Sequence, residues 1–192
     1  MDPLRAYTRL AGNSPASHRT KRLKESNKDM SSQVILKNLT ERNIIGLKKI
    51  FDSSGPFVAV RSISDYWLYA RLFNNTCIIA KDNDVLVGAL LAFCDQTRSY
   101  KEIYIQDVVV LPEYQNKGIG TLLLEEFIDR AKALNIGRVW LTSEAENRNA
   151  MKLWEKLGFV NHEADYIKEG LWVTKDLKGP GRDRVVYSLD VV

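Results

Sequence analysis

The stretch VVVLPEYQNKGIGTLLLEEF, residues 108–127, joins a predicted strand to a predicted helix through a turn that contains two glycines. Its opening run, Val108–Leu111, is typical of a strand that is buried on both faces. Gly118 and Gly120 allow the backbone to approach a ligand closely, and the first amides of the helix have no partners within it. A negative charge placed there gains on the order of 0.3 to 1 kcal/mol from the helix dipole, and Lys117 adds a cation. The stretch therefore predicts a phosphate-binding turn.

This turn differs from the two common nucleotide-binding loops. A Walker loop requires GxxxxGK[ST] and a dinucleotide fingerprint requires GxGxxG, and neither pattern occurs at residues 115–121. A Gly-x-Gly beside the end of a strand is also common as an ordinary tight turn. The surrounding sequence has to decide between these interpretations.

Hydrophobic periodicity outside the turn predicts strands and helices in a mixed order. We expect strands at Gln33–Asn38, Thr76–Ala80, Val85–Phe93, Glu102–Leu111, Arg138–Thr142, Phe159–His162 and Arg184–Val191. We expect helices at Thr40–Phe51, Tyr66–Phe73, Gly120–Ala133 and Asn149–Leu157. Thr40 is the predicted cap of the first helix, and Ser62 with Asp65 the capping pair of the second. Because β-hairpins precede β-α-β units, the chain is expected to form one α/β (α+β) domain over residues 30–192.

The charge of the chain is concentrated at its beginning. Residues 1–29 carry seven Lys and Arg against three Asp and Glu, which accounts for the whole formal net charge of +4. We expect this segment to be a disordered basic extension, and the neutral remainder argues against a nucleic-acid partner. Cys77 and Cys94 lie in apolar runs and are expected to be buried, reduced thiols of a cytoplasmic protein. No stretch is long and apolar enough to predict a membrane partner.

Two segments resemble the signatures of the GNAT superfamily of N-acetyltransferases. The stretch at 108–127 is similar to its Gln/Arg-x-x-Gly-x-Gly/Ala signature, and NRNAMKLWEKLGF at 147–159 resembles its Asn-x-x-Ala, aromatic, Gly-Phe signature. The resemblance covers about residues 33–191 in the order of elements. It implies a central mixed sheet of six to seven strands, splayed after the fourth strand and flanked by about four helices. It also implies an enzyme that uses acetyl-CoA as co-substrate and needs no metal.

The same resemblance implies a role for each matching position. The backbone of Val108, Val109 and Val110 would pair with the pantetheine arm, as an added strand would. Asn147 would hydrogen-bond the same arm, whereas Asn149 is expected to be a helix cap. The amides of the turn would hold the pyrophosphate, and they belong to Gln115, Asn116, Lys117, Gly118, Ile119, Gly120 and Thr121.

Trp154 departs from the family pattern, in which many members place a tyrosine that protonates the departing thiolate. An indole N–H is far too weak an acid for that step, although it can donate a hydrogen bond to sulfur. Trp154 is therefore expected either to contact the cofactor or to be a core residue of an amphipathic helix. A CoA thiolate can also take its proton from water.

An alkyl amine with a pKa near 10.4 must lose a proton before it attacks, which costs about 4.6 kcal/mol at pH 7. A base is therefore required, and the family places it on the fourth strand. The period-two face of that strand carries Glu102, Tyr104 and Gln106, and a β-bulge would turn Asp107 to the same side. We expect the catalytic residues among Tyr104, Glu102 and Asp107.

The acceptor amine is the least determined feature. The aromatic helix 66–71 and the segment Asp165–Arg184, with Tyr166, Glu169, Trp172 and Asp176, lie where the family builds its acceptor pocket. SGPF at 54–57 with the following helix faintly resembles the diaminobutyrate acetyltransferases, which favours the primary amine of a small molecule. Acetylation of a protein N-terminus or lysine is one alternative, and a non-catalytic acetyl-CoA-binding or interaction domain is another. The last strand, Arg184–Val191, is a candidate for pairing across a homodimer.

Overall fold

The computed structural model describes residues 34–97 and 101–191. The predicted basic extension and Gln33 lie outside these residues. The strands are β1 (Val34–Asn38), β2 (Ile78–Asp82), β3 (Val85–Asp95), β4 (Glu102–Val110), β5 (Arg138–Ser143), β6 (Val160–Asn161), β7 (Tyr166–Lys168), β8 (Leu171–Thr174) and β9 (Arg184–Asp190). The α-helices are α1 (Ile44–Asp52), α2 (Ile63–Arg71), α3 (Ile119–Ala133) and α4 (Arg148–Lys156), and the 3-10 helices are η3 (Glu41–Asn43) and η4 (Pro112–Tyr114).

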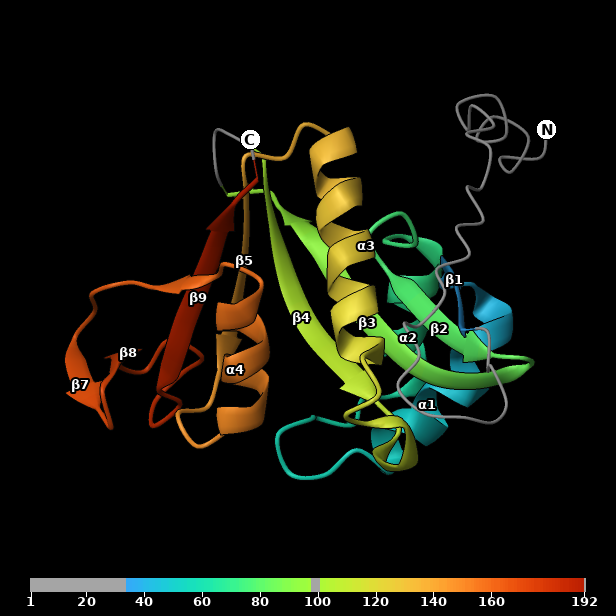
Figure 1. Cartoon of the computed structure of the whole chain (residues 1–192), viewed down its shortest axis with the longest axis horizontal. Helices are drawn as coiled ribbons and strands as arrows, with labels where there is room; N and C mark the ends of the chain where they lie inside the picture. Colours follow the sequence, from blue (N-terminus) through green and yellow to red (C-terminus); the bar gives the residue numbers. More distant parts are fainter. Residues whose placement is uncertain (1–33, 98–100, 192) are drawn as a thin grey trace.

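All nine strands of the described residues belong to one mixed sheet with the order β1-β2-β3-β4-β5-β9-β8-β7, and β6 pairs with β9 (Figure 1). β4 and β5 are parallel, whereas the other neighbours are antiparallel. The predicted α/β fold with a mixed sheet and four flanking α-helices is confirmed over the described residues. The sheet has two strands more than the six to seven that were expected.

The two additional strands are the hairpin of β7 and β8. All three residues of β7 are exposed, so the sequence has no apolar alternation there to reveal a strand. Glu169 and Gly170 form its turn with φ values of 50° and 79°. Positive φ at both central residues is typical of a two-residue hairpin turn, but Glu at the first of them is an unusual signal.

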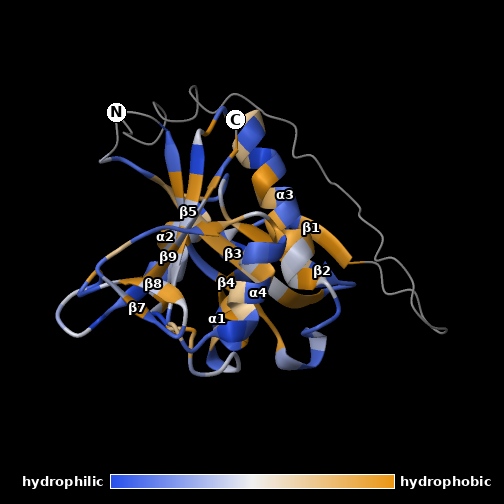
Figure 2. Cartoon of the chain, turned by 60° about the vertical axis from the view of Figure 1, so that its left-hand side comes forward, coloured by the Kyte–Doolittle hydropathy of each residue, from blue (hydrophilic) through white to orange (hydrophobic). Residues whose placement is uncertain are grey.

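Helices cover both faces of the sheet. One core cluster lies between the sheet and α3 and α4, with Leu123, Phe127 and Trp154 among its buried members. The second lies between the sheet and α1 and α2, with Phe51 and Tyr66 among its members. Figure 2 shows hydrophobic residues along the strands and hydrophilic residues in the surrounding loops. The sheet is therefore the middle layer of three.

The predicted caps position the first two helices. Ser62 Oγ accepts a hydrogen bond from the Asp65 amide, and the Asp65 carboxylate accepts one from the Ser62 amide, which confirms the capping pair of α2. Thr40 forms a capping box with Asn43, but the chain first makes the 3-10 turn η3 and enters α1 only at Ile44.

β4 contains a β-bulge at the point where its pairing with β5 ends. Asp107 is opposite Leu91 on β3 and Ile105 is opposite Ala92, so Gln106 is an extra residue without a partner on β3. The last rung between β4 and β5 joins Ile105 to Leu141. Figure 1 shows β4 and β5 side by side at one end of the sheet and apart at the other. The predicted splay after the fourth strand lies here.

Two expectations about single elements are wrong. Cys77 is buried, but Cys94 is exposed, because β3 continues past its last rung with β2 at Leu90 and has a strand on one side only. The last strand cannot pair across a dimer through a free edge, because β5 lies on one side of β9 and β6 and β8 lie on the other.

In residues 34–97 and 101–191, no helix combines the length and apolar character that crossing a bilayer requires.

We expect Gly88→Ala to lower the free energy of unfolding by about 1 to 3 kcal/mol, because an added methyl group overpacks the contact between β3 and α3. A Cβ at this position would lie 3.1 Å from Ile119 Cγ2 and 3.2 Å from both Leu123 Cδ1 and the Val109 carbonyl oxygen. Urea denaturation followed by circular dichroism measures the change.

Gly46→Ala is the matched control. Its added Cβ would lie 3.7 Å from the nearest atom, in ordinary contact, and the position is inside α1. Alanine in a helix interior is expected to raise the free energy of unfolding by about 0.5 to 1 kcal/mol. Equal stability of the two variants would contradict the close approach of α3 to the sheet.

Candidate active site

A cleft of about 630 Å³ opens between β4 and β5 where the two strands separate. Residues 105–110 of β4 form one wall, and residues 141–144 with one side of α4 form the other. The turn before α3 and the loop after α1 close its ends. Because β4 has lost β5 after Ile105, the polar backbone groups of residues 106–110 on this side have no strand partner among the described residues. An extended ligand can take that place.

The turn at residues 115–120 has the backbone that the sequence predicted. Asn116 and Gly118 have φ values of 59° and 81°, and α3 begins immediately afterwards at Ile119. The Gln115 side-chain amide donates to the Val110 carbonyl oxygen at 3.0 Å, which holds the turn against the end of β4. The first amides of α3 therefore face the cleft end with no partners inside the helix.

Eleven of the twelve residues predicted to bind the cofactor line this cleft, and Lys117 does not. Its ammonium lies over the ring of Tyr114, 4.9 Å from the ring centroid. A cation–π contact of this kind holds the Lys117 ammonium at Tyr114, which itself lines the cleft. Lys117 is thus the one residue of 115–121 that does not line the cleft.

The beginning of α4 places two asparagines in the cleft wall. Asn147 occupies the N-cap position, but its side chain makes no capping hydrogen bond and its amide is available to a ligand. Asn149 lies within α4, so the expectation that it caps the helix is wrong. The chain enters α4 one residue earlier than the apolar periodicity indicated.

Trp154 combines the two roles between which the sequence left a choice. It is 7% exposed, belongs to the core cluster and packs edge-on against Phe159, with 6.4 Å between ring centroids. It also lines the cleft, and its buried indole N–H has no hydrogen-bond acceptor among the described residues. An unpaired buried donor is costly, so Trp154 is positioned to hydrogen-bond a ligand atom but not to supply a proton.

Asp107 is the carboxylate that the fold brings to the cleft. Ile103 and Ile105 face the α3 side of the sheet, and after the bulge Val108 and Val110 do so, which turns Asp107 to the α2 side with Val109. Its side chain is 9% exposed and pairs with Arg61 Nη1 at 2.5 Å. Burial raises the pKa of Asp107 from 3.8 to about 6, although Arg61 opposes the increase.

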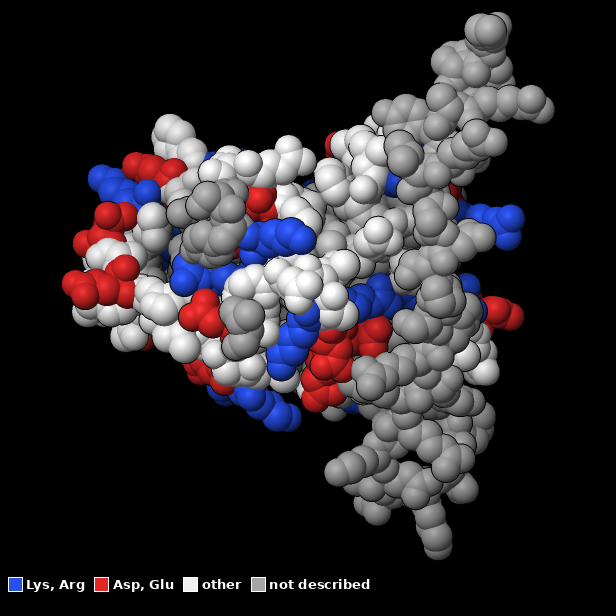
Figure 3. All heavy atoms as spheres, turned by 90° about the horizontal axis from the view of Figure 1, so that it is seen from above, with Lys and Arg blue, Asp and Glu red and all other residues white. Residues whose placement is uncertain are grey.

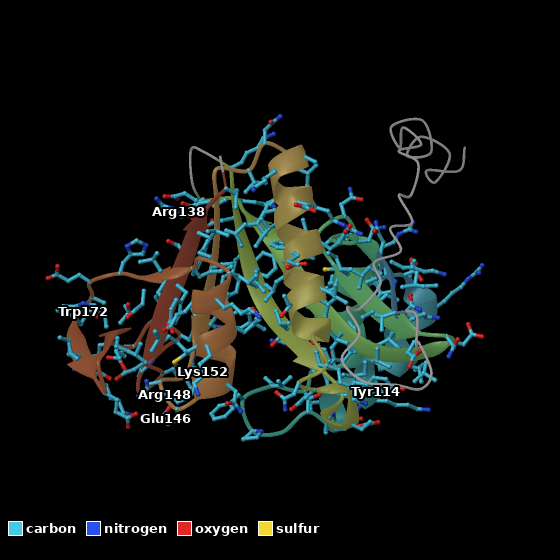
Figure 4. All side chains as sticks on the ribbon, viewed as in Figure 1. Tyr114, Arg138, Glu146, Arg148, Lys152 and Trp172 are labelled. Atoms are coloured by element: carbon cyan, nitrogen blue, oxygen red, sulfur yellow. The ribbon has the colours of Figure 1, made fainter. Side chains whose placement is uncertain are left out.

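The structure does not bring Glu102 or Tyr104 into the cleft. Glu102 is buried at the first rung of β4 with β5, opposite Arg138, which Figure 4 places at the far end of the sheet. At about 3.4 Å per residue along a strand, it is too remote from the splay to act as a base. The Tyr104 hydroxyl lies 2.9 Å from Thr142 Oγ1, and only Thr142 of this pair lines the cleft.

Sequence reasoning missed Arg61, Thr142 and Glu144. Arg61 lies in the loop before α2, where its amide donates to the Tyr66 hydroxyl oxygen and its side chain reaches Asp107. Nothing in the sequence pattern relates residue 61 to residue 107, because tertiary packing alone brings them together. Thr142 and Glu144 could have been found from the alternation along β5, because residues two apart on a strand lie on the same side, here the side of Trp140.

The segment Asp165–Arg184 contributes less to the cleft than expected. Figure 4 shows Trp172 at the outer end of the sheet, away from β4. Tyr166 donates to Asp183 at 2.6 Å, and Glu169 forms an ion pair with Arg148 at the start of α4. Lys168 pairs with Glu146 at 2.6 Å, so the hairpin is tied to the loop before α4. Neither Tyr166, Glu169, Trp172 nor Asp176 lines the cleft.

The described surface mixes the two signs of charge. Lys and Arg alternate with Asp and Glu on the face seen in Figure 3, outside the grey atoms. Within residues 34–97 and 101–191, no group of three His, Cys, Asp or Glu side chains is placed to hold a metal ion. The expected absence of nucleic-acid and metal partners stays a prediction.

A sheet that splays at a bulge, with an anion-binding helix start at the cleft end and a buried carboxylate in the wall, is suited to an extended ligand that carries phosphate groups. Residues 47–159 match the sequence model of the acetyltransferase (GNAT) family. The chain belongs to this family, which confirms the predicted class of enzyme, an N-acetyltransferase.

The chain is similar to curated relatives that act on different amines. It is 28% identical over 140 residues to "Probable N-acetyltransferase san" of Drosophila melanogaster, with 71% of this chain and 74% of that protein covered. It is 35% identical over 105 residues to "[Ribosomal protein bS18]-alanine N-acetyltransferase" of Escherichia coli strain K12, covering 54% and 66%. It is 28% identical over 110 residues to the L-2,4-diaminobutyric acid acetyltransferase of Halalkalibacterium halodurans, covering 57% and 54%.

Solved structures have the same fold. Arabidopsis thaliana Naa50 in complex with the bisubstrate analogue CoA-Ac-MVNAL superposes with a TM-score of 0.66 at 25% identity, covering 82% of this chain and 98% of that one. Diaminobutyrate acetyltransferase EctA from Paenibacillus lautus superposes with a TM-score of 0.67 at 17% identity, covering 83% and 95%.

We expect the Asp107 carboxyl to titrate with a midpoint near 6 in the folded protein, because burial disfavours its charge. Its pKa is higher folded than unfolded, so its contribution to stability is present at acidic pH and is lost as the pH rises through about 6. Carbon-13 NMR of labelled aspartate carboxyls measures the midpoint, with Asp107→Asn to assign the signal.

Arg61→Met should move this midpoint upward, because Arg61 is the neighbour that most strongly lowers the pKa. Arg71→Met is the matched control, since Arg71 pairs with Glu41 at the exposed end of α2. A wild-type midpoint near 3.8 would contradict the buried position of Asp107.

Proposed function

We propose that the chain transfers acetyl directly from acetyl-CoA to the primary amine of a small molecule, with Asp107 as the general base. The observation that carries this proposal is the cleft that joins the anion-binding turn, the unpaired part of β4 and the buried Asp107 carboxylate. Such a cleft orients a thioester and an amine for a reaction between them.

The cleft residues fit the chemical parts of acetyl-CoA. The turn before α3 offers backbone amides to the pyrophosphate, and residues 108–110 of β4 offer a strand edge to the amide groups of the pantetheine arm. Asn147 adds a side-chain amide on the opposite wall. When bound, acetyl-CoA supplies an activated acyl group with a thiolate as the leaving group.

Asp107 meets the requirement for a base. With a pKa of about 6, it is ionised at neutral pH and is still a stronger base than an ordinary aspartate. It takes the proton that the acceptor ammonium must lose, and the amine nitrogen then forms its bond to the acetyl carbon as the carbon–sulfur bond breaks. Arg61 holds the carboxylate in place and keeps its pKa from rising further.

As the amide forms, the nitrogen loses a second proton to water, and the leaving thiolate receives its proton from water. Trp154 occupies the position of the family tyrosine, and its indole N–H is a donor of hydrogen bonds but not of protons. Trp154 contributes a hydrogen bond from its indole N–H to the bound ligand. The described residues of the cleft wall offer this N–H no other acceptor.

The segment between β8 and β9 partly covers the side of the sheet where the acceptor would bind, which favours a small molecule as the acceptor. Lys178, between β8 and β9, lies over the ring of Tyr104 at 5.2 Å from its centroid, so this segment reaches across β4. The cytoplasm is the proposed location, because acetyl-CoA is used there and Cys94 is an exposed, unpaired thiol in the described residues.

A protein N-terminus is the second candidate acceptor, since one relative's name specifies a ribosomal-protein alanine.

We expect thiol release from acetyl-CoA that depends on one class of amine. The assay tests a panel of candidate acceptors, which contains diamines, amino acids, arylalkylamines and peptides with free N-termini. Gly118→Trp should abolish release and CoA binding measured by calorimetry, because the side chain fills the anion-binding turn at φ 81°. Gly170→Trp is the control, with the same kind of strain at φ 79° but in the β7–β8 turn outside the cleft. Binding without turnover on any amine would favour a non-catalytic acetyl-CoA-binding domain.

We expect Asp107→Asn to reduce kcat about 10²- to 10⁴-fold and to leave the Kd for CoA unchanged, because it removes the base but not the carrier site. Asp52→Asn removes an exposed carboxylate that pairs with Lys48 and should leave kcat unchanged. Full activity of Asp107→Asn would exclude Asp107 as the base.

A further inference from the structure

A second cavity, of about 320 Å³, lies on the α2 side of the sheet. Its lining combines side chains from α2 and the segments beside it with one ring from β3, and consists of Arg61, Asp65, Leu68, Tyr69, Phe73 and Phe93. The cavity is distinct from the cleft between β4 and β5, and the two cavities share no lining residue.

Three aromatic rings form the wall of this cavity. The ring centroids of Tyr69 and Phe73 are 6.1 Å apart, and those of Phe73 and Phe93 are 5.6 Å apart. Phe93 continues the row to Tyr104 on β4, again at 5.6 Å. Burial raises the pKa of Tyr69 to about 12, which shows that its hydroxyl is partly shielded from water. Such a wall favours an apolar occupant.

Arg61 connects this cavity to the base of the proposed reaction. Its side chain lines the cavity and donates to Asp107, which lines the cleft. The aromatic cavity therefore lies within the length of one arginine side chain of the proposed base. The side group of the acceptor is the part of the substrate that this cavity would select.

The polar residues of the cavity do not select a second ammonium group. Both hydrogen bonds from Ser62 go to Asp65 Oδ2, so this carboxylate serves the cap of α2. Arg61 lies in the same lining, and its charge is already paired with Asp107. A cation–π contact at an exposed site gains only about two- to fivefold in affinity. Burying about 100 Å² of an apolar ring gains on the order of fifty- to a hundredfold.

We propose that the aromatic cavity binds the side group of the acceptor, and that the acceptor is a small primary amine that carries an apolar ring. This inference rests on the proposed function, because the cavity is assigned to the substrate of that reaction. It selects arylalkylamines over diamines and over amino acids with polar side chains.

The first experiment measures thiol release with phenethylamine, 2,4-diaminobutyrate, lysine and a short peptide that begins with phenylalanine. We expect kcat/KM for phenethylamine to exceed that for either diamino acid at least tenfold. A preference for a diamino acid would overturn the inference and leave the proposed function intact. Transfer to the peptide but not to phenethylamine would support the aromatic cavity and overturn the small-molecule acceptor. No release with any amine would instead be a failure of the proposed function.

The second experiment changes the rim of the cavity without touching the buried rings. Leu68 is 39% exposed and lines the cavity, whereas Leu72, at the end of the same helix, is 61% exposed and does not. We expect Leu68→Lys to raise the KM and the calorimetric Kd for phenethylamine about tenfold, because it places a charge beside the bound ring. Leu72→Lys should change neither.

The calorimetric measurement does not depend on catalysis. Equal Kd values for phenethylamine in wild type, Leu68→Lys and Leu72→Lys would overturn the assignment of the cavity even in an active enzyme. The Kd for CoA serves as the check that the cleft is unaffected, and it should be the same in all three proteins.

Discussion

The site depends on the loss of pairing between β4 and β5 after the rung that joins Ile105 to Leu141. Two adjacent parallel strands normally satisfy each other's backbone groups along their whole length. Here the extra residue Gln106 bends β4 away, and the polar backbone beyond it is left for a ligand. The cleft, the free strand edge and the entry of the anion-binding turn into it all follow from this separation.

The same bulge decides which side chain becomes chemically important. With strict alternation, Asp107 would face α3 and the apolar core, where an ionised carboxylate is very costly. After the bulge it faces the loop before α2, and Arg61 provides a charge partner within hydrogen-bond distance. Burial and the ion pair act in opposite directions on its pKa, and burial is the larger effect. The balance leaves a carboxylate that is ionised near neutral pH and yet basic.

The cleft walls are held by interactions of different kinds. On one side, the close approach of α3 to β3 at Gly88 and of α3 to α4 at Gly120 fixes the anion-binding turn through packing. On the other side, the β7–β8 hairpin is tied to the start of α4 by exposed ion pairs, such as that of Lys168 with Glu146. Exposed ion pairs stabilise weakly and are screened by salt. The anion-binding side of the cleft is therefore held by close packing, whereas these ion pairs add little to what holds the start of α4.

The sequence alone determined the family, most of the elements and the turn that faces the phosphate groups, because these depend on local periodicity, glycine and the helix start. The capping pair of Ser62 and Asp65 and the strand–turn–helix at 108–127 are encoded within a few neighbouring residues. The hairpin at 166–174 was not predicted, because β7 is exposed throughout and β8 is a strand of four residues with only Leu171 and Val173 buried. Only the tertiary structure decided that Asp107 and not Glu102 lies in the cleft, that Arg61 is its partner, and that the Lys117 ammonium lies over the Tyr114 ring. These outcomes depend on a one-residue shift in strand register and on contacts between segments far apart in the chain. Neither can be predicted from the neighbouring residues alone.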